Sequence, residues 1–115
     1  MDTMNWIPLR DEDQLRQICE NSAGRPQVIF KHSTRCSTSA LVKNRLERAA
    51  QPESIDFYYL DLLSHRPISN SISQTFRIEH ESPQVLLIVN GKCVYDESHL
   101  GITMDGILER SEIRA

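Results

Sequence analysis

The sequence predicts an α/β fold in which helices flank a central mixed sheet of four strands, in the order αβαβαββα. An apolar strand, an amphipathic helix and a second β-rich strand follow one another over residues 27–61, which is the pattern of a parallel βαβ unit. Asn90-Gly91 then separates two further β-rich runs, and this dipeptide is typical of a two-residue hairpin turn between antiparallel strands. The remaining segments have helical spacing and are expected to cover the sheet.

The composition indicates one globular domain over residues 1–115. Thirteen basic and 16 acidic residues give a net charge of -3, so neither nucleic acid nor an anionic membrane is an expected partner. The longest aliphatic run, residues 85–89, is too short to span a bilayer, and the polar start of the chain lacks the hydrophobic region of a signal peptide. We therefore expect a cytoplasmic protein.

The first helix is predicted between Asp11, which begins a capping-box pattern with Gln14, and Gly24. Trp6 and Leu9 precede it and are expected to pack beneath it. The first strand covers about residues 27–31, the second helix about 37–51 and the second strand about 55–61. In the second helix the predicted core-facing residues are Val42, Leu46, Ala49 and Ala50.

A third helix is predicted to begin near Pro67 and to bury Ile68, Ile72 and Phe76 at a spacing of four residues. Its polar face, residues 69–71 and 73–75, is expected to be solvated. The hairpin strands cover residues 84–89 and 92–95, and a last helix is predicted at about residues 103–113. Asp61 is expected to serve the turn after the second strand rather than acid–base chemistry.

Cys36 is the candidate nucleophile, because it lies where the first strand gives way to the second helix. A thiol at a helix N-terminus faces unpaired backbone N–H groups and the positive end of the helix dipole, which favour thiolate over thiol. The alternative is a small buried residue, since free cysteines are often buried. The neighbouring residues are mostly polar, and Lys31 and Arg35 add positive charge, so the sequence favours a reactive cysteine.

The other two cysteines are predicted to be structural. Cys19 falls on the buried stripe of the first helix, and Cys93 falls on the strand that is expected at the edge of the sheet. Three widely spaced cysteines suit neither a disulfide framework nor a zinc site.

Two separated signatures resemble the thioredoxin fold: a cysteine at a strand-to-helix turn, and Ser82-Pro83 directly before a buried strand. The second signature resembles the cis-proline segment that lies beside the reactive cysteine throughout that superfamily. Cys36-Ser37-Thr38-Ser39 lacks the second cysteine of the dithiol members. Residues 5–9, 31–36 and 80–84 together resemble the monothiol bacilliredoxin family of the bacillithiol system. Many of its members have proline after the cysteine, where this chain has Ser37.

The resemblance implies an enzyme that removes bacillithiol from S-bacillithiolated cytosolic proteins through a mixed disulfide between Cys36 and bacillithiol. Bacillithiol would be a co-substrate, with no tightly bound cofactor, no metal and a monomeric protein. Two interpretations of Lys31 and Arg35 stay open: they meet the malyl carboxylates of bacillithiol, or they are solvated surface charges. The candidate substrate-binding residues are Lys31, Thr34, Arg35, Ser37, Ser39, Ser82 and Pro83.

Two other functions stay open on the sequence. Some C-x-x-S glutaredoxins share an iron–sulfur cluster between two monomers, although this chain lacks the glycine-phenylalanine pair that follows the cysteine in those proteins. A thioredoxin-like adaptor with a redox-modified cysteine is the third interpretation. His32 and His80 are conceivable acid–base groups, but a thiolate held at a helix terminus needs no general base.

Overall fold

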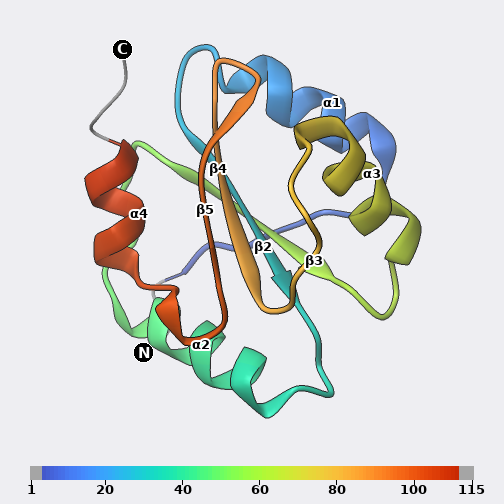
Figure 1. Ribbon diagram of the computed structural model, residues 1–115. Coiled ribbons are helices and arrows are strands. Elements are labelled where there is room, and N and C mark those ends of the chain that lie inside the picture. The colour runs from blue at the N-terminus through green and yellow to red at the C-terminus, as the bar shows by residue number, and fades with distance from the viewer. Residues whose placement is uncertain (1–3, 112–115) are drawn as a thin grey trace.

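The computed structural model describes residues 4–111 and contains a five-stranded mixed sheet with helices on both faces (Figure 1). The strands lie in the order β1-β3-β2-β4-β5. In chain order the elements are β1 (Ile7–Pro8), α1 (Glu12–Asn21), β2 (Gln27–His32), α2 (Ser37–Arg48), β3 (Asp56–Asp61), α3 (Arg66–Phe76), β4 (Gln84–Val89), β5 (Lys92–Ser98), the short 3-10 helix η1 (His99–Gly101) and α4 (Met104–Ser111).

The sheet has the predicted mixture of strand directions. β2 pairs with β3 in parallel and with β4 in antiparallel orientation, and β5 pairs with β4 as the second strand of the hairpin. Asn90 and Gly91 both have positive φ at the hairpin turn, as the Asn-Gly signal requires. The predicted α/β class and element order are therefore confirmed, with one additional strand.

The additional strand, β1, corrects the prediction of four strands. Ile7 and Pro8 pair in parallel with Tyr58 and Tyr59 of β3 at the edge of the sheet. A two-residue strand is too short to produce an alternating pattern. Pro8 also lacks the N–H group of a central strand, although an edge strand tolerates it. Leu9 packs with Leu15 and Ile18 of α1 as predicted, whereas Trp6 packs against the core on the opposite face of the sheet, which corrects its predicted place beneath the first helix.

Each face of the sheet has its own hydrophobic core. On one face α2 and α4 cover Val28, Phe30 and Phe57, and on the other α1 and α3 cover Ile29 and Leu60. Figure 1 shows these two helix pairs on opposite sides of the strands. β2 lies in the middle of the sheet, so all six of its residues are buried. This burial includes the polar residues near its carboxyl end, which bears directly on the site.

The helix starts follow the sequence signals more closely than the helix ends do. Asp11 caps α1 by accepting a hydrogen bond of 2.9 Å from the Gln14 amide, as predicted. The last residue of α1 is Asn21, before the predicted stop at Gly24. α2 ends at Arg48 instead of continuing to about residue 51, because Ala49 is extended with ψ of 152°. Ala50 is consequently exposed and is not part of the core stripe.

The remaining predicted elements are present with small shifts of their bounds. Ile68, Ile72 and Phe76 of α3 are buried as predicted. β5 continues to Ser98, and α4 begins at Met104. Residues 112 and 113, which the sequence assigns to the last helix, lie outside the described residues. Within residues 4–111, no helix has the length and apolar character needed to cross a membrane.

Candidate functional site

The site lies at the end of the sheet where β2 ends. Antiparallel pairing of Lys31 with Gln84 places Pro83, the residue before β4, beside the end of β2. The turn that leaves β2 reaches Cys36 within four residues of His32. The Ser82–Pro83 peptide bond is cis, as predicted. Two segments far apart in the sequence, 33–36 and 82–83, thus belong to the same end of the molecule.

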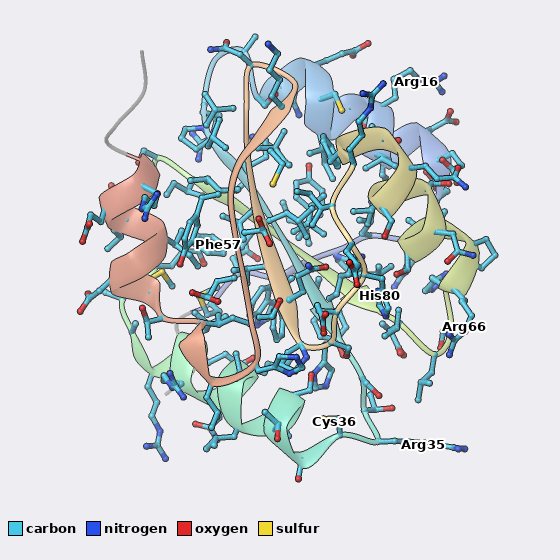
Figure 2. The ribbon with its side chains drawn as sticks, viewed as in Figure 1. Arg16, Arg35, Cys36, Phe57, Arg66 and His80 are labelled. Carbon is cyan, nitrogen blue, oxygen red and sulfur yellow. The ribbon has the colours of Figure 1, made fainter. Side chains whose placement is uncertain are left out.

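Cys36 is the N-cap residue of α2 and is half-buried. Its backbone is extended, with φ of -106° and ψ of 119°, and its amide donates to the Ser33 carbonyl at 3.2 Å. The Cys36 side chain caps none of the first-turn amides in the described structure. A half-exposed sulfur at the first turn of a helix therefore lies where the sequence predicts it. In Figure 2, Cys36 and the neighbouring Arg35 lie at one end of the molecule, and the Arg35 side chain extends away from it.

Ser39 stands where dithiol members of the superfamily have their second cysteine, and it is fully buried. Its Oγ lies 2.6 Å from His32 Nδ1 and accepts a hydrogen bond of 3.1 Å from the Ser33 amide. Ser39 therefore joins the first turn of α2 to the end of β2. This contact differs from the expectation that Ser39 meets substrate, because its hydroxyl is already used inside the protein.

His32 is held in an aromatic cluster. Its ring lies 5.8 Å from Phe30 and 5.5 Å from Tyr59, and Phe30 in turn stacks on Trp6 at 5.5 Å. Burial, followed by the nearby Lys43 ammonium, lowers the pKa of His32, so the neutral imidazole is favoured. A neutral ring whose Nδ1 faces the Ser39 hydroxyl serves to position the turn before Cys36.

Three other predicted contact residues are exposed around Cys36, namely Thr34, Arg35 and Ser37. Across the site, Ser82 is half-buried and Pro83 is buried. The Ser82 Oγ is a buried atom without a hydrogen-bond partner among the described residues. A buried hydroxyl without a partner is costly unless a ligand or water satisfies it. The Ser82 hydroxyl is thus a buried polar group of the cis-proline segment whose hydrogen bond is not supplied by the described residues.

Lys31 corrects the sequence analysis. Lys31 lies at the end of the first strand as predicted, but the expected surface charge is fully buried. Its ammonium faces α3, where Nζ lies 3.5 Å from Ser73 Oγ and 3.3 Å from His80 Nδ1. Because β2 is flanked by helices on both faces, every side chain of this strand enters a core. The burial of Lys31 could have been predicted from the βαβ pattern, because the first strand of such a unit is expected in the middle of the sheet.

The polar face of α3 is a second correction, because it is only partly solvated. Ser69 is 2% exposed, and its Oγ lies 3.4 Å from His80 Nδ1. Ser73 is half-buried beside Lys31. These serines face polar partners on β2 and on the loop before Pro83. Helical spacing within α3 does not show such partners, so it could not predict that the two serines are buried. Together, Lys31, Ser69, Ser73 and His80 form what we call the lysine cluster.

The buried ammonium predicts a pH-dependent effect on stability. Burial lowers the pKa of Lys31 from 10.5 to about 8, so folding disfavours its charged form. Lys31→Met should therefore raise the free energy of unfolding at pH 7, by at most about 3 kcal/mol. Between about pH 8 and pH 10.5 the unfolded lysine holds its proton while the folded lysine loses it, so wild-type stability rises and the advantage of the variant shrinks.

Urea unfolding at pH 7 and pH 10 measures this difference. Lys43→Met is the matched control, because the Lys43 ammonium is paired with Glu47 at 2.6 Å and its removal should not stabilise the protein. A Lys31→Met variant less stable than wild type at pH 7 would contradict the expected cost of the buried charge.

Cys19 and Cys93 lie toward the other end of the sheet. Cys93 pairs with Ile88, four residues along β4 from Gln84, a separation of roughly 13 Å in a strand. Cys19 lies one turn before Ser22, whose Oγ accepts a bond of 2.8 Å from the hairpin residue Gly91. Burial raises the pKa of both thiols, that of Cys93 to about 11. Both predicted structural cysteines are therefore remote from Cys36.

The described geometry defines a thioredoxin fold, and known structures agree. One similar structure, described as a candidate oxidoreductase with a thioredoxin fold, has a TM-score of 0.79 and 30% sequence identity, with 92% of each chain covered. The thioredoxin Mala s 13 of Malassezia sympodialis has a TM-score of 0.77 at 16% identity, covering 96% of this chain and 95% of its own. Thioredoxin from Trypanosoma brucei brucei has a TM-score of 0.73 at 15% identity, covering 96% and 89%.

Residues 7–107 match the family described as monothiol bacilliredoxin BrxC, so this chain belongs to the monothiol bacilliredoxin family. Family and fold together support thiol–disulfide exchange as its general chemistry.

Proposed function

We propose that this protein removes bacillithiol from S-bacillithiolated proteins by monothiol exchange at Cys36. The observation that carries the proposal is the isolation of this sulfur: Cys36 is half-exposed at the start of α2, buried Ser39 stands at the position of a second cysteine, and both other thiols lie toward the far end of the sheet. An exchange reaction with one thiol needs a small thiol as its second reactant, and bacillithiol is the reactant that the family name supplies.

The proposed reaction has two steps that balance in sulfur and electrons. The Cys36 thiolate attacks the bacillithiol sulfur of the mixed disulfide, forms a Cys36–bacillithiol disulfide and expels the target cysteine as a thiolate. A second bacillithiol thiolate then attacks the bacillithiol sulfur held by Cys36. This step releases oxidised bacillithiol, a disulfide, and restores the Cys36 thiolate.

The residues around the sulfur have proposed parts in binding. The backbone beside cis-Pro83 can pair with the disulfide-bearing segment of the target as a short strand. Exposed Arg35 is adjacent to Cys36 and is suited to a carboxylate of bacillithiol. Thr34 and Ser37 offer exposed hydroxyls on the same turn.

Turnover on a defined substrate tests the proposal. A target protein carrying one bacillithiol is incubated with catalytic amounts of this protein and free bacillithiol, and mass spectrometry follows the loss of the adduct. We expect many turnovers per Cys36 and much slower turnover on the same target carrying glutathione. Release of no bacillithiol beyond the uncatalysed rate would overturn the proposal.

The same preparation tests the two other functions. Visible absorbance that disappears on acidification would favour a shared iron–sulfur cluster. Stoichiometric oxidation of Cys36 without turnover would favour an adaptor.

A further inference from the structure

The lysine cluster contains a buried positive charge that no carboxylate neutralises. Among residues 4–111, no Asp or Glu oxygen lies within 4.0 Å of Lys31 Nζ. Its two partners are neutral groups at long distances, Ser73 Oγ at 3.5 Å and His80 Nδ1 at 3.3 Å. Buried charges in proteins are normally paired, because an unpaired one is costly. The ammonium therefore has unused capacity for an anion.

Within the lysine cluster, the His80 side chain is the exposed one, and it lies over the buried Lys31 ammonium. His80 is exposed, whereas Lys31 beneath it is fully buried. His80 Nδ1 must accept the bond from the ammonium, so the ring is neutral and binds the cluster only through contacts of 3.3 Å and 3.4 Å. An exposed side chain held by long hydrogen bonds can change rotamer quickly.

Two cations and one carboxylate act electrostatically on His80. Burial lowers the pKa of His80, and the Lys31 ammonium and, more weakly, the Arg66 guanidinium at the start of α3 lower it further. Glu81 acts in the opposite direction, but its Oε1 is bonded to His99 Nε2 at 3.1 Å. Figure 2 shows His80 between the sheet and α3, with Arg66 at the α3 end. An anion that replaced the ring would thus meet the Lys31 ammonium.

We propose that the lysine cluster is a closed carboxylate-binding subsite, in which the His80 ring turns aside and a carboxylate of the small thiol binds the Lys31 ammonium. The inference rests on the proposed function, since it names the part of the site that selects carboxylate-bearing thiols. Lys31 pairs with Gln84, the residue after cis-Pro83, so the subsite adjoins the proposed binding segment. Ser69 and Ser73 supply hydroxyl donors from α3.

Calorimetric titration with malate tests the subsite without any exchange reaction. We expect malate to bind the reduced wild-type protein and to bind Lys31→Met roughly tenfold more weakly. His80→Ala should bind malate more tightly than wild type, because no ring has to be displaced. Lys92→Met, which removes an exposed charge on β5, should bind like wild type. Equal binding by wild type and Lys31→Met, or weaker binding by His80→Ala, would overturn the proposal.

A rate measurement extends the test to the thiol. The Cys36–bacillithiol mixed disulfide is reduced by mercaptosuccinate, which carries two carboxylates, and by uncharged mercaptoethanol. We expect Lys31→Met to lower the ratio of the two rates roughly tenfold and Lys92→Met to leave it unchanged. If Arg35→Gln lowers the ratio and Lys31→Met does not, the carboxylates bind at the turn and the subsite is wrong. Turnover on the bacillithiolated target that persists in that case shows that the proposed function survives.

Discussion

Replacing Cys36 with serine should reduce the removal of bacillithiol to the uncatalysed rate. A serine hydroxyl cannot form the mixed disulfide, and neither of the other two cysteines lies at this end of the sheet. The fold should be preserved, because Cys36 is half-buried and its side chain makes no capping bond. Turnover of the bacillithiolated target, with circular dichroism of the variant, measures both effects.

The matched control is a double variant in which Cys19 and Cys93 are replaced by alanine. It keeps the proposed nucleophile and removes the two thiols whose pKa is raised by burial. We expect it to retain most of the activity. A folded double variant without activity would contradict exchange through a single thiol.

The second large effect is expected on stability, from Phe30→Ala. Phe30 is fully buried and lies between Trp6 and His32, with ring centroids at 5.5 Å and 5.8 Å. Removing a buried phenylalanine ring leaves a cavity and costs about 3–5 kcal/mol, a large part of the about 5–15 kcal/mol that stabilises a typical domain. Urea unfolding measures the loss.

Leu41→Ala is the control for this change, because Leu41 is 57% exposed on α2 and its truncation should cost less than about 0.5 kcal/mol. The Phe30 variant should also lose order at His32, whose ring stacks on Phe30. A loss below about 1 kcal/mol would show that the aromatic cluster does not support the strand that leads to Cys36.

The sequence predicts those parts of the fold that local patterns encode. The Asn90-Gly91 turn, the Asp11 cap and the burial of Ile72 each follow from a short pattern, and all are present. β1 was missed because two residues carry no period, and its pairing with β3 is a long-range contact. The end of α2 was misplaced because the extended conformation of Ala49 leaves no sequence signal as strong as a proline or glycine.

The sequence predicts the two surface segments of the site, but it does not predict the contacts of the buried polar residues between them. Cys36 and cis-Pro83 lie at the same end of the sheet, as the two signatures indicate. The contacts of Ser39 with His32 and of Lys31 with His80 depend on which way a buried strand turns its polar side chains. One residue along a strand reverses the face, so His32 enters the aromatic cluster near α2 while Lys31 enters the cluster at α3.

The remoteness of the other cysteines has a kinetic consequence. Without a neighbouring sulfur, a loaded Cys36 has no first-order route to release, so its lifetime under the proposed scheme is set by collisions with free small thiol. The rate of regeneration is then proportional to the concentration of that thiol. When the reduced pool falls, the protein accumulates in the loaded form and turnover slows in step. The fraction of protein that carries the mixed disulfide at Cys36 would thus rise as the concentration of reduced small thiol falls.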